Sequence, residues 1–477
     1  MNTPSEIYKE YEKARQEKAG LGKNGIYEQS LINRRFYLGD QWYGANVSNE
    51  RPLVRHNIIR RIGEYKMGDL LRERLNVSFF ANGIGCTVDD QAKILNDRKK
   101  LSGGEFIFDK NADEQEFRLL TSALSDYLKI SFSENRIEEK LTEALKNSFI
   151  TGTGVLYSYW DTTGAFGLGD VACEVLPIEN LYFGDSTCET VEKQPYIIIV
   201  TRPDTAEVQH MAEIYGGEVS RIKPDSLSEG KTTVFTKLYK KGYGSNATVM
   251  AVSVTEKAVV RPEYDTRLNR YPVNIFSWET KENCIYGESE VTHLLPNQIA
   301  INRLLSASVW SSMYMGMPIM TVNGDTVTED ITNDPGQIIK VYGTNEDVAG
   351  AVKYVAPPDF SSGFNSGVSS LIQNTLEGCG AGMTTLGKLS YNNTAAIESI
   401  SSVSGVSALS LKTRYRCFLS DIALTFLCFF MTYYGNRRLL IEDQNGRWYF
   451  PFNSDRYKNL KFSARCEVVK EDVNESN

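Results

Sequence analysis

Residues 296–315 read PNQIAINRLLSASVWSSMYM, and this long run sets the order of elements on either side of it. Pro296 fits the first turn of a helix, where a missing N–H costs nothing, and the pattern continues to Met315. About 19 residues at about 1.5 Å each predict a rod of roughly 28 Å. Gln298, Asn302 and Ser306 recur every fourth residue, which predicts that they share one polar face of the helix.

The residues after this helix predict a segment of short strands and turns, followed by a second helix. Residues 317–360 contain short strand patterns and turns, with strands expected at IIKVYG (338–343) and VKYVAPP (352–358). A second helix is expected over 364–376. A cluster of glycines then breaks the pattern before a last long helix over 394–434; its members are Gly378, Gly380, Gly382 and Gly387.

The residues before the first long helix predict helices and then strands. Helices are expected over the first 18 residues, over 26–38, over 57–75 with Asn57 as the cap, and around 117–127 and 137–144, the last started by Asn135. From Val155 the apolar period changes to two, and a closing strand is expected at LKFSARCEVV (460–469). This mixture predicts the α+β class.

The negative charge of the chain is concentrated in one region. The whole sequence carries a net charge of -8, and residues 285–410 hold eleven acidic and four basic residues, a net charge of -7. Such a region repels phosphates and disfavours tight binding of nucleic acid by charge neutralisation. A solvated acidic surface and an acidic channel along which DNA slides both remain open at this point.

No sequence motif predicts catalysis or a metal site. GMTTLGKL (382–389) has the spacing of a phosphate-binding loop, but Leu389 stands where a Ser or Thr hydroxyl should bind Mg²⁺. A predicted helix also precedes the loop where a strand should, and two asparagines interrupt the helix that should follow. The three histidines are far apart, and the eight cysteines include no C-x-x-C pair. We therefore expect no enzyme activity, no cofactor and no bound metal.

The sequence also bears on cellular location. The N-terminal residues MNTPSEIYKEYEKARQEKAG are charged and polar, so no secretory signal is expected. The apolar run over 422–434 is shorter than the roughly 20 residues that cross a bilayer, which favours a buried core helix over a membrane span.

The predicted order of elements resembles that of the portal protein family of tailed bacteriophages. Local patterns that carry the resemblance are NRRFYLGDQW (33–42), RPLVRHNIIRRIGEY (51–65), ALKNSFITGTGVLYSYWD (144–161), EVLPIENLYFGD (174–185) and YGESEVTHLLPNQIAINRLLSA (286–307). Each pattern is degenerate alone, but the order of elements in which they stand extends over nearly the whole chain.

The resemblance implies a portal-like fold with an α/β wing, a two-helix stem, a small strand-rich clip, a tunnel loop and a long helix. The implied ranges are a wing over 1–288 that is strand-rich over 155–280, stem helices over 289–316 and 361–383, a clip over 317–360, a tunnel loop over 384–393, a long tunnel helix over 394–435, and a closing wing strand with a short tail over 436–477. Because few residues follow the closing strand, the helical crown of the family is expected to be reduced or absent.

The resemblance also implies site residues. The DNA channel and tunnel loop would use Thr384, Thr385, Lys388, Asn392, Asn393, Glu377 and Glu398. A head-to-tail ring packs two different faces of each subunit together, and the polar face of Gln298, Asn302 and Ser306 suits that contact. Clip residues expected to bind partners are Lys340, Tyr342, Lys353 and Tyr354.

The implied function is a ring, typically dodecameric, at one capsid vertex of the virion. Double-stranded DNA would pass through it during packaging, retention and ejection, and the ring would dock terminase, head-tail adaptor, major capsid and scaffold proteins. Assembly is expected in the host cytoplasm without a membrane. Two alternatives stay open: an ATP-binding enzyme that uses the loop from Gly382 to Lys388, and a membrane-associated pore protein.

Overall fold

The structure is a computed structural model that describes residues 3–22, 24–46, 52–72, 75–84, 110–226, 230–242, 247–315, 319–325, 327, 330–331, 338, 340–355, 362–380, 394–443, 446–457 and 460–468. It mixes helices and sheets, as the α+β prediction requires. The chain forms two compact units. Unit 1 comprises Met1–Arg34, Gly63–His293 and Tyr391–Asn477, and unit 2 comprises Arg35–Ile62 and Leu294–Ser390. Residues 35–62, which we expected to belong with the rest of 1–288, therefore belong to unit 2.

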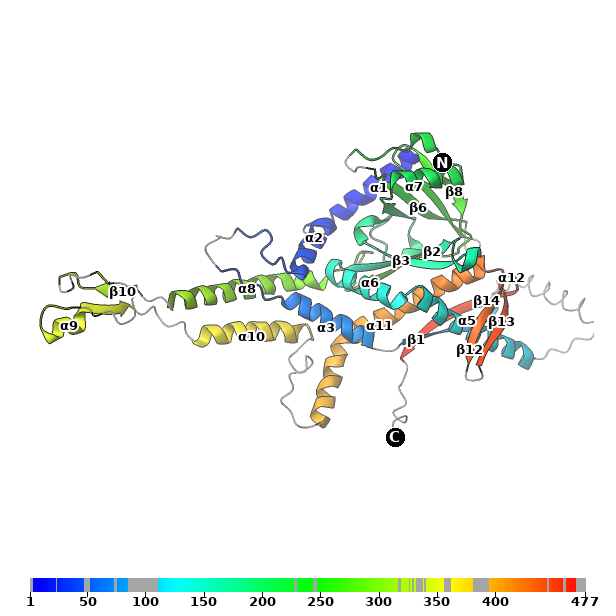
Figure 1. Cartoon of the computed structure of the whole chain (residues 1–477). Helices are drawn as coiled ribbons and strands as arrows, with labels where there is room; N and C mark the ends of the chain where they lie inside the picture. Colours follow the sequence, from blue (N-terminus) through cyan, green and yellow to red (C-terminus); the bar gives the residue numbers. More distant parts are fainter. Residues whose placement is uncertain are drawn as a thin grey trace, which may run out of the picture. The chain divides into compact units, whose positions relative to one another are not determined.

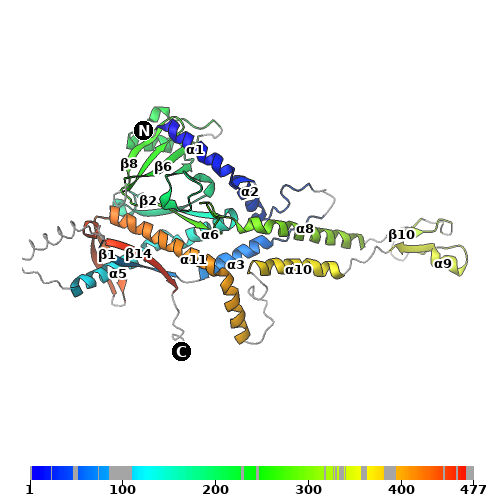
Figure 2. The ribbon, with the colours of Figure 1, turned by 180° about the vertical axis from the view of Figure 1, so that it is seen from behind.

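The largest sheet of unit 1 is antiparallel and has a helix on each face (Figures 1 and 2). Phe235 packs in the cluster with Ile7 and Ala14 of the first helix, whereas its neighbour Val234 packs with Val208 of the second. Adjacent strand residues point to opposite faces, so the two helices cover opposite sides. The strands, in sheet order, are β4(Leu181–Phe183), β5(Tyr196–Thr201), β6(Val234–Lys241), β7(Thr248–Val254) and β8(Val259–Asp265), and the helices are α1(Pro4–Ala19) and α7(Thr205–Tyr215).

A second sheet of unit 1 follows helix α6(Ile137–Thr151). Its strand order is β3(Asp170–Leu176), β2(Thr153–Asp161), β9(Val273–Ser277). Gly152 connects α6 to β2 with φ +96°, and a Cβ there would lie 2.2 Å from the Gly287 carbonyl oxygen. Only glycine fits this turn. Short 3-10 turns in unit 1 are η1(Ala165–Gly167), η2(Ile178–Asn180), η3(Val191–Lys193) and η4(Val219–Arg221).

Helix α11(Thr394–Tyr433) supplies much of the core of unit 1. Phe418, Ile422, Phe426 and Phe430 recur every four residues and are all buried. They pack against other elements of the unit; the ring centres of Phe426 and Phe132, for example, lie 5.2 Å apart. Residues Ala408–Tyr433 are long and apolar enough to cross a membrane by length and composition. In this structure their apolar face packs inside unit 1, as expected for a core helix.

Strand pairings between distant segments complete unit 1. β1(Leu75–Ile84) pairs antiparallel with β14(Leu460–Val468), and Leu75 lies opposite Val468. β12(Asn436–Asp443) and β13(Gly446–Asn453) form a hairpin. The sequence predicted β14 but neither β1 nor this hairpin. The remaining helices of the unit are α5(Lys110–Glu134) and α12(Ser454–Tyr457).

Two helix-cap predictions had different outcomes. Helix α3(Ile58–Arg72) is capped by Asn57, whose Oδ1 accepts a hydrogen bond from Arg60 N at 3.0 Å, as predicted. The Asn135 prediction was wrong, because Arg136 holds the cap position of α6 with φ +49°. The Asn135 amide instead donates to the Val171 carbonyl at 2.9 Å. Helix α2(Gly25–Leu38) begins within one residue of its predicted start.

Unit 2 is built on α8(Glu290–Met315) and α10(Ser362–Gly378), which run side by side in Figures 1 and 2. At their far end β10(Ile319–Val322) pairs antiparallel with β11(Val352–Val355), and α9(Asn345–Ala351) precedes β11. The start of α8 that the local pattern predicted at Pro296 was wrong. Ser289 Oγ accepts from Val291 N at 3.1 Å and so caps the helix earlier, which places Pro296 inside it.

Candidate functional site

The polar face of α8 is covered by the chain's own residues 52–59. Gln298 is 2% exposed, and its Oε1 accepts hydrogen bonds from Ile58 N at 2.9 Å and Ile59 N at 3.3 Å. Its Nε2 donates to the His56 carbonyl at 2.6 Å. The Gln298 side chain thus supplies an acceptor for two N–H groups at the start of α3, where no helical bond is available.

Asn302 and Ser306 extend the same network along α8. Asn302 is 1% exposed; its Oδ1 accepts from His56 N at 3.0 Å, and its Nδ2 donates to Gln41 Oε1 at 2.6 Å. Ser306 Oγ accepts from Val54 N at 2.9 Å. This corrects the prediction that Gln298, Asn302 and Ser306 face a neighbouring subunit. Their polar atoms bond backbone groups of Val54, His56 and Ile58 inside unit 2, because the N–H groups of this segment need acceptors that no strand supplies.

The far half of α8 exposes apolar side chains that the sequence pattern did not single out. Val309 is 41% exposed and Met313 is 51% exposed. They are one helical turn apart, so they share a face. The sequence signal for these two residues was the apolar character of VWSSMYM (309–315). A buried helix would show the same pattern, so the sequence did not predict that the side chains are exposed.

Helix α10 contacts α8 through a polar pair near the first turns of α8 and the last turn of α10. Asn297 Nδ2 donates to Thr375 Oγ1 at 3.3 Å, and Thr375 and Leu376 are buried. Glu377 is exposed, and Gln373 Nε2 donates to its Oε1 at 2.7 Å. The structure therefore leaves Glu377 on a surface, where its charge can act on a passing anion.

Among the described acidic residues of the 285–410 region, Glu290 is buried. Glu290, 5% exposed, accepts from Lys66 Nζ at 2.5 Å and from Trp278 Nε1 at 2.8 Å. All three residues belong to unit 1. Glu290 thus fixes the start of α8 and does not add to an acidic surface.

The segment expected to bind partners contains a small hairpin. Thr321 Oγ1 donates to the Lys353 carbonyl at 3.0 Å across β10 and β11. Lys340, Tyr342 and Lys353 are exposed, and Tyr354 lies on β11. The predicted strand at 338–343 is wrong for the residues described there, which lie in no strand; the strand that pairs with β11 is β10.

The predicted tunnel-loop residues Thr384, Thr385, Lys388, Asn392 and Asn393 lie outside the described residues, as does the whole phosphate-loop-like segment 382–389. Glu398 lies in the first turns of α11. The structure therefore brings together the two helices and the hairpin, but it does not place the loop.

Unit 1 holds a buried lysine that the sequence did not reveal. Lys18 is 0% exposed and donates to the carbonyls of Ile178 and of Leu181, the latter at 2.9 Å. Burial lowers the pKa of Lys18 to about 7, and the nearby Glu179 carboxylate opposes this shift. Three aromatic rings surround the ammonium group with their centres within 5.3 Å, those of Tyr27, Tyr182 and Tyr286.

Comparison with known proteins gives no relative: no protein-family model matches the chain, and no curated protein matches it significantly.

Proposed function

We propose that this chain is the subunit of a portal ring, through which double-stranded DNA enters and leaves a phage capsid. The observation that carries the proposal is unit 2: two neighbouring helices, α8 and α10, are joined at their far end by a small hairpin. This arrangement supports the stem-and-clip assignment that the sequence resemblance implies. α8 and α10 would line the channel, and the hairpin would meet terminase and the head-tail adaptor.

Two surface properties of unit 2 support this proposal. Val309 and Met313 leave an apolar strip on α8 that a neighbouring copy would cover, because large apolar groups gain free energy when they leave water. The exposed Glu377 and the low number of cations in residues 285–410 suit a surface along which DNA slides without being held. In a cyclic head-to-tail ring, typically of twelve copies, the apolar strip would be covered by the neighbouring copy and the cation-poor surface would face the DNA.

Negative-stain imaging of the purified chain tests the proposal. We expect rings with a central hole, and light scattering at the mass of a closed oligomer. Monodisperse monomers across a range of concentrations would count against a portal ring. Two controls address the alternatives: equilibrium dialysis with ATP checks for a nucleotide enzyme, and flotation with liposomes checks for a membrane pore.

A further inference from the structure

Two adjoining cavities of unit 1 open beside α1 and form one groove. Their volumes are about 360 and 590 Å³, and Tyr11, Arg15 and Arg202 line both. Tyr11 and Arg15 are one turn apart on α1, and Arg202 directly follows β5. The groove therefore lies where the helix crosses the largest sheet, a place fixed by the core contacts of Ile7 and Ala14.

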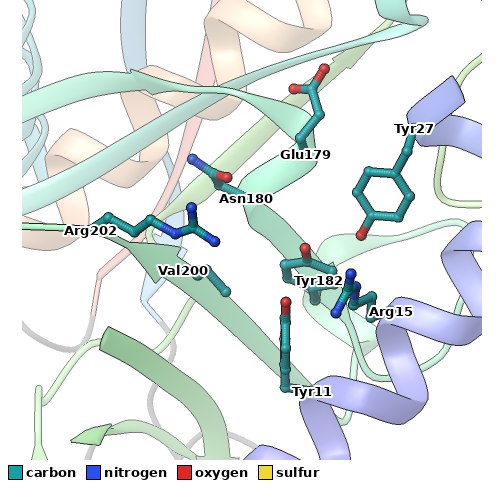
Figure 3. Close-up of a pocket in the computed structure, with 8 residues that line it drawn as sticks. All are labelled: Tyr11, Arg15, Tyr27, Glu179, Asn180, Tyr182, Val200 and Arg202. Carbon is teal, nitrogen blue, oxygen red and sulfur yellow. The ribbon is translucent and has the colours of Figure 1, made fainter. Parts of the chain in front are cut away.

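The two guanidinium groups face the same space. In Figure 3 Arg15 and Arg202 approach the cavity from opposite sides, with Tyr182 between them and Tyr11 beside it. The rings of Tyr11 and Tyr182 meet edge to face, with centres 4.8 Å apart, and the floor includes the buried Val200. The groove thus combines fixed aromatic and apolar surface with two positive charges.

Positive charge is in excess along the groove. Lys223 and Lys257 line the larger cavity in addition to Arg15 and Arg202, whereas Arg221, which also lines it, pairs with Glu218 at 3.1 Å. Among the residues that the structure describes, neither Arg15 nor Arg202 has a carboxylate within ion-pair distance. This excess occurs on a chain whose net charge is -8.

Two of the three groove carboxylates already have partners. Glu179 pairs with Arg34 at 3.1 Å, and Asp225 accepts from the Thr233 backbone N–H at 3.0 Å and hydroxyl at 2.6 Å. Glu256 is the third. Because no described carboxylate pairs with Arg15 or Arg202, an incoming anion would meet two guanidinium groups whose charge is not yet neutralised.

We propose that this groove binds an acidic peptide segment of a partner protein. Carboxylates of the peptide would bind Arg15 and Arg202, since guanidinium groups match carboxylates in geometry, and an apolar side chain would pack on Tyr11 and Tyr182. Tyrosine and arginine are also the residues that contribute most to protein interfaces. The proposal does not rest on the ring function.

The lining favours a peptide over nucleic acid. Duplex DNA carries about one charge per 1.7 Å of axis, and the carboxylates of Asp225 and Glu256, which have no cationic partner among the described residues, would repel such a continuous row of phosphates. A peptide can place apolar or neutral residues opposite these carboxylates. Cavities of a few hundred Å³ also suit individual side chains.

Fluorescence anisotropy of a labelled peptide with Glu, Asp and Phe repeats tests the proposal with the full chain. We expect binding that weakens as salt is added and that is at least about tenfold weaker for Arg15→Gln and for Arg202→Gln, since each removes a charged hydrogen bond. The matched control is Arg136→Gln, which removes an exposed charge at the start of α6, away from both cavities. It should change the affinity less than about twofold. Circular dichroism establishes that all variants are folded.

Three outcomes would overturn the proposal: no binding of the acidic peptide, equal loss in the Arg136→Gln control, or tighter groove-dependent binding of a single-stranded oligonucleotide. Competition by inorganic phosphate alone at similar concentration would likewise assign the groove to small anions. Ring imaging of the Arg15→Gln protein separates this inference from the proposed function, since the groove variant should assemble like the parent.

Discussion

The Nζ atom of Lys18 lies 4.6 Å from the centre of the Tyr182 ring, and the Lys18 side chain is fully buried. The unfolded chain binds a proton at Lys18 up to a pKa of 10.5, whereas the folded chain loses that proton near pH 7. Between these values the unfolded state binds more protons, so the contribution of Lys18 to the free energy of unfolding rises with pH.

Replacement of Lys18 by Met should flatten this dependence. We expect the difference in unfolding free energy between wild type and Lys18→Met to change by about 1.4 kcal/mol per pH unit between pH 7 and 9. Burial also raises the pKa of Tyr27, Tyr182 and Tyr286, so measurements should stop below pH 10, where those hydroxyls would ionise in the unfolded chain. Parallel urea unfolding curves at each pH provide the test. Identical slopes for both proteins would mean that Lys18 titrates normally in the fold.

Removal of the Gln298 amide should loosen the segment it holds. Gln298→Leu leaves Ile58 N and the His56 carbonyl without that partner, which should cost about 2–3 kcal/mol. Hydrogen exchange of the His56 and Ile58 amides should accelerate together. Gln373→Leu is the control, because Gln373 is exposed on α10 and should change stability by less than about 0.5 kcal/mol. Unchanged exchange at His56 and Ile58 would show that other contacts hold the segment.

A charge in the apolar strip of α8 should prevent assembly. Met313→Asp places a carboxylate where a neighbouring copy is proposed to pack, and an unpaired buried charge is costly. Light scattering should show monomers or small oligomers in place of rings. Ser312→Asp adds the same charge at the adjacent exposed position and should assemble normally. If Met313→Asp forms rings as readily as wild type, the strip is not a subunit contact.

Reversal of charge at Glu377 should slow DNA movement. In a packaging reaction Glu377→Lys adds one cation per subunit at one height of the proposed channel, and translocation should slow most at low salt. Glu139→Lys, which changes a 75% exposed carboxylate of unit 1, is the control. Equal packaging rates for both variants over a salt series would place Glu377 away from the DNA.

Local patterns predicted the elements whose stability depends on their own residues. The period-two runs became β2, β3, β5, β6, β7 and β9, and Asn57 caps α3 because a cap needs only residues within one turn. β1 was missed because its partner β14 lies at the other end of the sequence, and its residues alone do not show that pairing.

The candidate site shows the same limit. Spacing predicted that Gln298, Asn302 and Ser306 share one face, and they do, but spacing does not reveal what covers a face. The groove at Arg15 and Arg202 was missed for a related reason. Its residues come from helices α1 and α2, strands β4, β5 and β6, and the loops near them, and only the fold brings them together.

The interleaving of the two units constrains how the protein is made. The backbone N–H of His56 donates to Asn302, which lies 246 positions later in the sequence. Strand β1 has its pairing partner only after β14 is synthesised, because Leu75 lies opposite Val468. During synthesis the early segments leave the ribosome with unpaired backbone groups and apolar surface, and loops of this length close slowly. Neither unit is a single contiguous segment of the chain. Expression of either unit alone therefore requires a rejoined or circularly permuted gene, and the nascent chain is a natural client for chaperones.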